Sequence, residues 1–343
     1  MTRRGVLRCA AAAALFGISA PAASRLAGDM GAFTLAGLLY VGAALAVLPI
    51  IGRSRPTPRA IRRSAPRLAT AVVLGGAVGP VLLAAGLSHA PAATASLLLN
   101  LELVFTTVLA AVFFREHVGR RVAAGTALVV VAGVVLTWSA TADLRWGALL
   151  IAGACLCWGV DNCVTAVVDE LTPAQITFTK GVVAGGANLT IGLLLGGAPG
   201  GWSVLMAIVV GAFGYGVSIT LWVAGARDLG AARGQLVFAT APFVGAVVAW
   251  TAFADRVTAR ELVSLLIAAL GVSFVLRSSH EHQHRHEPLE HDHEHRHDDA
   301  HHAHPHGEDM DVRHQHPHSH QAIVHSHPHV PDLHHRHENS TSS

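Results

Sequence analysis

The sequence contains few charged residues and almost no lysine. Asp, Glu, Lys and Arg make up 13% of its 343 residues, about half of the usual share in soluble domains. Lys180 is the single lysine among 24 basic residues. No nucleotide-binding P-loop or catalytic constellation occurs, so we expect neither ATP hydrolysis nor enzymatic turnover. We also expect no nucleic-acid partner and no required cofactor.

Cysteine is scarce as well. The chain has four, Cys9, Cys155, Cys157 and Cys163, and all lie in apolar runs. Such cysteines are more often small buried hydrophobic residues than disulfide partners. Cys155 and Cys157 would point about 200° apart on a helix, so they cannot bind the same metal ion.

Long apolar runs dominate the chain as far as Leu276. A helix needs about 20 apolar residues to cross a hydrocarbon core of about 30 Å. Ten runs meet this length approximately, at 6–24, 33–51, 70–88, 92–114, 122–139, 147–168, 174–195, 203–224, 231–253 and 259–276. The sequence therefore predicts an all-α integral membrane protein with ten transmembrane helices and the lipid bilayer as a partner.

The first run also has features of a secretory signal. Arg3 and Arg4 precede it, and the small residues at 20–24 resemble a cleavage site. We favour a helix that is kept, because the internal repeat described below needs this segment.

Arginines are distributed unequally between alternate loops. One side has fourteen, and the other has only Arg25, Arg145, Arg256 and Arg260. The fourteen are Arg3, Arg4, Arg8, Arg53, Arg55, Arg59, Arg62, Arg63, Arg67, Arg115, Arg120, Arg121, Arg227 and Arg233. The positive-inside bias predicts a bacterial-type inner (plasma) membrane protein with both termini in the cytoplasm.

The chain contains an internal repeat. When its two halves are aligned, Leu97 falls on Leu236, and at a slightly larger offset Phe16 falls on Trp158. We assign the repeats to 5–139 and 146–277. Because each has five segments, an odd number, the two must enter the membrane in opposite orientations, as in many secondary transporters.

Several motifs resemble a known family. They are ASLLLNLELVFT at 95–106, FRE at 114–116, AGVV at 132–135, TAPFV at 240–244, Asp255 and LGV at 270–272. Together they are similar to the EamA repeat of the drug/metabolite transporter superfamily. The resemblance covers roughly positions 5 to 276. It implies two inverted five-helix repeats and substrates such as amino acids, nucleotide-type metabolites or organic cations, usually exported.

One position departs from that family. The fourth helix of the family commonly has a proline, which the ninth helix of this chain has at Pro242. The fourth helix has Leu103 instead, preceded by Glu102.

Two acidic residues lie near the bilayer centre in the predicted membrane segments. Glu102 and Asp161 are candidates for substrate binding or coupling, because an ionisable group in the membrane usually faces protein or water. Thr106 shares a helix face with Glu102, and Asn100 is close in sequence. The alternative role for Glu102 is a structural hydrogen bond between helices.

The sixth helix carries a polar face. Trp158, Asp161, Asn162 and Thr165 follow the i, i+3, i+4, i+7 spacing. This face could bind a cation through the carboxylate and the ring, or relay protons. A polar seam that the facing helix satisfies is the alternative.

Lys180 lies about 10 Å into the seventh helix. We expect its side chain to snorkel to the cytoplasmic interface, and pairing with Asp161 or Glu102 is the alternative. Gln235 and Asn188 are further candidate lining residues.

The 64-residue tail from His280 to Ser343 differs from the rest of the chain. It holds 22 of the 24 histidines and has four arginines against twelve acids, net −8, whereas the preceding part is net +10. Many histidines recur at alternate positions: His280, His282, His284, His286, His291, His293, His295, His297, His314, His316, His318, His320, His325, His327 and His329.

The composition of the tail predicts disorder in the absence of metal, because little can be buried. Imidazoles favour Zn, Ni, Co and Cu, and a flexible chain can wrap several ions. The competing interpretation is pH sensing, since all 22 histidines titrate near pH 6.5. We favour metal binding.

We therefore expect a proton-coupled exporter of a small solute, in which one carboxylate takes the proton and the tail links transport to transition-metal handling. Two alternatives stay open: an exporter of a metal-free metabolite that the tail regulates, and a membrane-tethered metal reservoir. A second copy of the chain is a candidate partner.

Overall fold

A computed structural model describes most of the chain. The described residues are 3–51, 58–114, 119–138, 140–165, 168, 171–196, 198–229, 234, 237–276, 280–286, 289–295, 314–320 and 323–329. Two compact units result, the membrane-type helical bundle and the tail. Each unit is described by itself.

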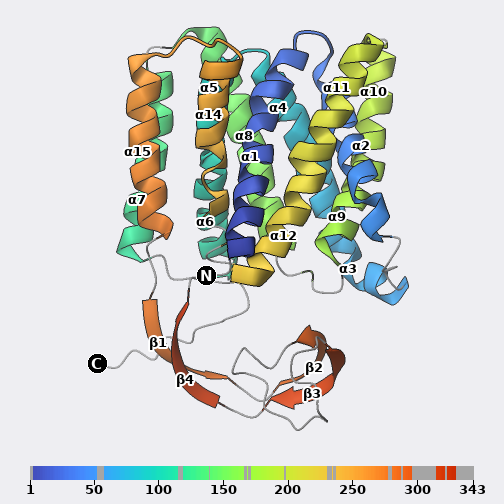
Figure 1. Cartoon of the computed structure of the whole chain (residues 1–343), viewed down its shortest axis with the longest axis vertical. Coiled ribbons are helices and arrows are strands. Elements are labelled where there is room, and N and C mark those ends of the chain that lie inside the picture. Colours follow the sequence, from blue (N-terminus) through green and yellow to red (C-terminus); the bar gives the residue numbers. More distant parts are fainter. Residues whose placement is uncertain are drawn as a thin grey trace. The chain divides into compact units, whose positions relative to one another are not determined.

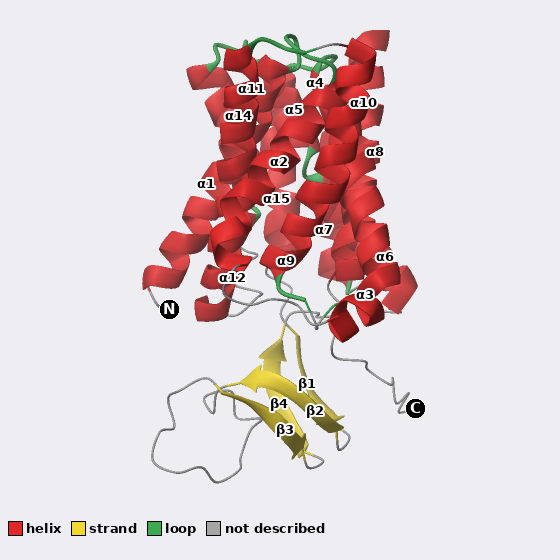
Figure 2. Ribbon diagram, turned by 90° about the vertical axis from the view of Figure 1, so that its right-hand side faces the viewer, coloured by secondary structure: helices red, strands yellow, loops and turns green. Residues whose placement is uncertain are grey.

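The bundle consists of helices that run roughly along one common direction, with loops at their ends (Figure 1, Figure 2). Its α-helices are α1 (Arg3–Leu26), α2 (Ala32–Ile51), α3 (Pro58–Thr70), α4 (Gly79–Leu87), α5 (Ala92–Leu98), α6 (Leu101–Phe114), α7 (Arg120–Thr137), α8 (Ala142–Thr165), α9 (Pro173–Thr179), α10 (Gly186–Gly196), α11 (Gly201–Gly211), α12 (Ser218–Leu229), α14 (Ala241–Ala252) and α15 (Ala259–Leu276). Three π-helical segments join some of them: η1 (Ala71–Val78), η2 (Lys180–Gly185) and η3 (Ala212–Val217).

Eight helical runs of the described residues are long and apolar enough to cross a membrane. They are 3–26, 32–51, 61–87, 92–113, 120–137, 142–165, 173–196 and 201–225. Each coincides with one of the first eight predicted segments. The ninth and tenth predicted segments contain α14, a shorter apolar helix, and α15. The count of ten membrane crossings stays a prediction.

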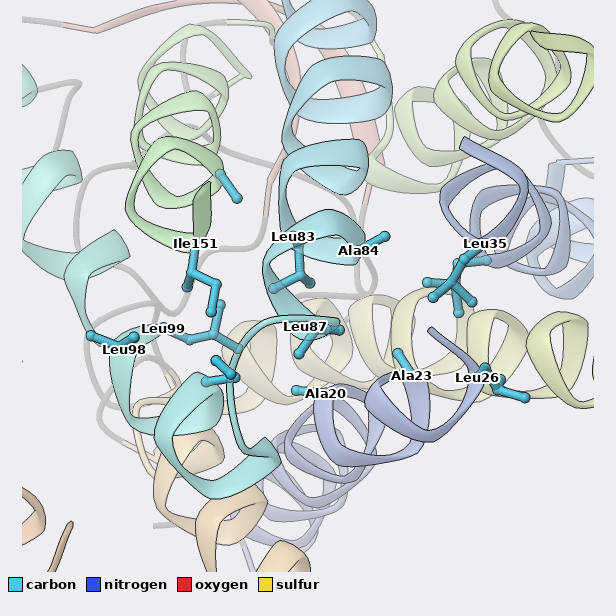
Figure 3. Packing of buried hydrophobic residues seen from close by; sticks show 14 of the residues in the cluster. Ala20, Ala23, Leu26, Leu35, Leu83, Ala84, Leu87, Leu98, Leu99 and Ile151 are labelled. Atoms are coloured by element: carbon cyan, nitrogen blue, oxygen red, sulfur yellow. The ribbon is translucent and has the colours of Figure 1, made fainter. Parts of the chain in front are cut away.

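The buried core of the bundle is built from aliphatic and small side chains. Figure 3 shows side chains of α1, α2, α4 and α8 converging with the end of α5. Leu35 and Ile151 are completely buried there. Alanines and glycines fill much of the remaining interface, which lets the backbones of membrane helices approach closely.

Matched glycine contacts relate the two repeats. A Cβ atom at Gly86 would collide with the backbone oxygen of Gly147. In the other half, a Cβ atom at Gly225 would collide with the thiol of Cys9 and lie 3.0 Å from the backbone oxygen of Gly5. The alignment of the repeats pairs Gly86 with Gly225 and Gly5 with Gly147, so the same close helix contact is built twice.

A break in the fourth membrane run is also repeated. Between α5 and α6, the amide of Asn100 donates to the carbonyl of Leu97, and its side chain donates to the same oxygen. Before α14, the amide and hydroxyl of Thr240 make the equivalent two bonds to Val237. The matching bonds pair Asn100 with Thr240 and Leu97 with Val237. The side chain of Asn100 therefore binds the backbone at the helix break.

A further acidic residue is buried at one end of the bundle. Glu261 accepts from the hydroxyl of Thr94 at 2.8 Å and from the amide and hydroxyl of Thr258 at 3.0 Å each. The carboxylate thereby begins α15 and ties it to α5. These contacts give Glu261 a structural role.

The tail contains four described strands. They are β1 (His280–His286), β2 (Leu289–His295), β3 (His314–His320) and β4 (Ile323–His329). β1 pairs antiparallel with β4, and β2 with β3, with registers that place His282 opposite His327 and His293 opposite His316. The disorder expected for the tail in the absence of metal stays a prediction. Strict alternation is the period of a strand, and it brings histidine opposite histidine along each ladder.

Candidate functional site

The central feature of the bundle is an ion pair between α8 and η2. The ammonium nitrogen of Lys180 lies 2.7 Å and 2.5 Å from the two carboxylate oxygens of Asp161. The two side chains are 12% and 9% exposed. Pairing both oxygens with one ammonium satisfies the charges that the bundle removes from water.

The local sequence explains where Lys180 lies. The seventh run begins at Thr172, whose hydroxyl accepts from the Gln175 amide, while the Gln175 side chain accepts from the Thr172 amide. This capping box fixes the start of α9, the helix that ends directly before the lysine. The expected snorkelling of Lys180 is wrong, because its ammonium group binds Asp161. The alternative pairing is the one observed.

Gly75 makes room for the ion pair. Any side chain at this position of η1 would collide with the Asp161 carboxylate. The carbonyl of Gly75 accepts two side-chain hydrogen bonds, from the hydroxyl of Tyr40 at 2.6 Å and from the indole of Trp158 at 3.2 Å. The π-helical segment therefore positions two aromatic rings next to the buried carboxylate.

A second polar cluster adjoins the first. The side-chain amide of Asn162 donates to Glu102 at 2.8 Å and to the hydroxyl of Thr106 at 3.3 Å. Asn162 follows Asp161 in α8, so the two carboxylates are connected through neighbouring residues of one helix. The predicted common face of Glu102 and Thr106 is confirmed by this shared contact.

Glu102 lies in the first turn of α6, directly after the helix break. Matching the hydrogen bonds of the two breaks pairs Glu102 with Pro242, whereas the sequence comparison paired Leu103 with Pro242. Proline is favoured in the first turn of a helix because its position needs no amide donor. A carboxylate is favoured there because the helix dipole is positive at this end.

The predicted polar face of α8 is divided between two neighbouring parts of the bundle. Trp158 and Asp161 face η1 and η2, while Asn162 faces α6. The hydroxyl of Thr165 donates back to the carbonyl of Asp161 in its own helix. Asn188 is buried and donates to the carbonyl of Ala77.

Gln235 lies outside the described residues. Cys155 is buried with its thiol near the carbonyls of Leu98 and Leu99. In the part of the chain whose side chains are described, no three His, Cys, Asp or Glu residues come close enough to hold a metal ion. The metal candidates of the tail, His280 to His329, are placed only by strand register.

Sequence reasoning missed the two tyrosines of the chain. The rings of Tyr40 and Tyr215 lie 5.7 Å apart, and Phe16 packs edge-on against Tyr215 at 5.8 Å. Both tyrosines are buried. Their rarity was the available signal, since a chain with only two tyrosines places both inside apolar segments.

The site can exchange one charged partner for another. Asp161 and Lys180 neutralise each other, so a charged solute that binds either of them must release the other. Glu102 supplies a further negative charge, and the aromatic rings offer surfaces for an apolar or cationic group.

Comparisons with known proteins agree with this architecture. The model of the EamA-like transporter family matches residues 3–139 and 145–277. An uncharacterized transporter from Methanothermobacter thermautotrophicus (strain Delta H) is 25% identical over 296 residues, which are 79% of this chain and 85% of that protein. A solved structure described only as "Crystal structure of protein" has a TM-score of 0.58 and 18% identity, and covers 79% of this chain and 95% of its own; this likeness concerns the fold alone.

Proposed function

Because the chain belongs to the EamA-like transporter family, we propose that its helical bundle carries a small charged solute through the site formed by Asp161, Lys180 and Glu102. The chain is a multi-pass membrane protein of a transporter family. We further propose that the solute is charged, that it is exported and that its transport is coupled to protons.

The observation that carries the proposal is the buried ion pair. Placing charges inside a membrane bundle costs several kcal/mol, so such groups are kept mainly where they serve a pathway. The pair of Asp161 and Lys180 also joins the sixth and seventh membrane runs beside two π-helical segments. In inverted-repeat transporters the substrate site lies where the repeats meet, and Gly75 of one repeat contacts Asp161 of the other.

The transport cycle alternates between two states of this pair. In the empty state Lys180 neutralises Asp161. In the loaded state the solute takes the place of one partner, and a proton moves to or from the partner that is left. Such an exchange couples export to the proton gradient without leaving an unpaired charge in the bundle. We place the protein in the inner membrane with both termini in the cytoplasm, following the distribution of arginines.

The test compares two substitutions in the same helix. Cells that produce the full-length protein are screened for resistance to toxic amino-acid analogues, quaternary amines and the ions of Ni, Co, Zn and Cu. Asp161→Asn should abolish any protection, while Asp143→Asn should retain it because Asp143 is an exposed residue at the start of α8. Protection that survives Asp161→Asn would contradict the proposal.

A second role concerns the tail. We propose that its histidines bind transition-metal ions, supported by their number and by the opposed histidines of the strand registers. Removing everything after Ser279 should lower the metal bound per purified protein without abolishing transport. Unchanged metal content would contradict this role.

A further inference from the structure

The charges of the site are unequal. It holds two carboxylates, Asp161 and Glu102, and one ammonium group, Lys180. A further buried acid of the described residues, Glu261, has its own partners at one end of the bundle. The site therefore offers two carboxyl groups as ligands for a cation, whereas Lys180 is the only basic group that the described contacts give to either of them.

We infer that the solute is a cation that displaces Lys180 from Asp161, and that the displaced lysine gives up its proton. This inference rests on the proposed transport function and specifies the class of its substrate. The net charge of the site does not change, because the solute brings one positive charge while the ammonium loses one. The proton passes from Lys180 to water on the side to which the site is open.

The surroundings of the ion pair suit a cation. Trp158 and Tyr40 meet at the carbonyl of Gly75, next to the Asp161 carboxylate. Aromatic rings stabilise a desolvated cation. The residue of α2 that binds this carbonyl is Tyr40, an aromatic residue and not a basic one. Titratable groups of four elements lie in this part of the bundle: Asp161 from α8, Glu102 from α6, Tyr40 from α2 and, beside Tyr40, Tyr215 from η3.

The inference also requires a basic group that can lose its proton. A lysine ammonium can lose its proton in a buried site, whereas an arginine guanidinium cannot. This difference separates proton exchange from a structural ion pair. If Lys180 were needed only to neutralise Asp161, arginine would be its best replacement.

The experiment uses full-length protein in liposomes that contain a pH-sensitive dye. Phenyltrimethylammonium and benzenesulfonate serve as probes, because they share one ring and carry fixed opposite charges. An inward gradient of phenyltrimethylammonium should raise the internal pH as protons leave, and a gradient of benzenesulfonate should not. Empty liposomes and Thr190→Val, an exposed residue of the same membrane run as Lys180, are the controls.

Two substitutions of the lysine give opposite expected results. Lys180→Arg should reduce the rate of cation movement at least about tenfold, because the guanidinium stays on Asp161. This reduction corresponds to an increase of about 1.4 kcal/mol in the activation free energy. Lys180→Met should keep exchange of external for internal cation, measured by isotope, while the pH change disappears. Gel filtration of each variant checks that it is folded.

The outcomes separate this inference from the proposed function. If the wild type transports benzenesulfonate and Asp161→Asn does not, the proposed transport function stands, but the inference that the solute is a cation is overturned. Wild-type activity in Lys180→Arg, or movement of neither probe by the wild-type protein, would also overturn the inference. If Asp161→Asn moves a probe as well as the wild type does, the proposed function itself fails.

Discussion

The two repeats build the same contact with different chemistry. In one place Gly75 packs against Asp161, and in the equivalent place Gly214 packs against Ser19. Both glycines lie in π-helical segments, η1 and η3. Both repeats therefore share the backbone arrangement, but only one of them has a charged residue at this contact. The repeat provides the helical scaffold, and the difference between Asp161 and Ser19 provides the charged site.

The helix breaks show the same division. Asn100 and Thr240 make matching bonds to the carbonyls three residues earlier. At the following matched position one repeat has Glu102 and the other has Pro242. The fold tolerates either residue in the first turn of the helix, so the carboxylate is available for a role that the backbone does not demand.

The largest effect should come from copying the charge into the uncharged half. Ser19 is 4% exposed and faces Gly214, and none of the described contacts gives it a basic partner. Ser19→Asp should lower the free energy of unfolding by about 3–5 kcal/mol, as an unpaired buried charge does. Thermal unfolding in detergent measures this, with Ser19→Ala as the control. Equal stability of the two variants would show that the halves are more alike than proposed.

Adding a methyl group to each equivalent glycine should separate stability from transport. Gly75→Ala and Gly214→Ala each force a shift of a packed neighbour, at a cost of about 1–3 kcal/mol. Only Gly75→Ala displaces the carboxylate of Asp161, so it alone should reduce transport strongly. Unfolding curves and transport rates are compared for both. Similar rates in the two variants would contradict the assignment of the site to one half.

Replacing the residue that follows each helix break should leave the fold largely intact. Glu102→Pro copies the second repeat and removes one amide bond to Leu99, so stability should change by about 1 kcal/mol. Transport should fall to the level of Glu102→Gln, because both variants lack the carboxylate. Pro242→Ala should retain transport. Full activity of Glu102→Pro would show that the carboxylate is structural.

Truncation after Ser279 should have the smallest effect on transport. The bundle is a compact unit without the strands of the tail. The solute rate should stay within about twofold of the full-length rate, well under about 1 kcal/mol, while bound Ni, Co, Zn or Cu falls. Transport assays and elemental analysis of the purified protein check both parts. A complete loss of transport would mean that the tail completes the site.

Local spacing predicted much of the site. The length and apolar composition of the runs predict membrane helices. The spacing of Trp158, Asp161 and Asn162 predicted one polar face of α8, which the structure divides between adjoining parts of the bundle. The link between Glu102 and Thr106 followed from one helical turn. These features depend on residues close in sequence.

The features of the site that the sequence did not predict depend on contacts between segments far apart in the chain. Whether Lys180 snorkels or pairs is decided by how η2 packs against η1 and α2, which brings the ammonium group to Asp161 of α8 and which spacing cannot reveal. The collision that reserves Gly75 for Asp161, and the hydrogen bond from Tyr40, arise from packing between separate helices. The π-helical segments also lack a sequence pattern that distinguishes them from α-helix.

The most direct test is cation exchange by the wild type, Asp161→Asn, Lys180→Met and the double variant, measured in liposomes with phenyltrimethylammonium. If the pair is the site, Lys180→Met exchanges the cation, while Asp161→Asn and the double variant are equally inactive, because the cation needs the Asp161 carboxylate whether or not the lysine is present. Exchange at the wild-type rate by folded Asp161→Asn would contradict the account.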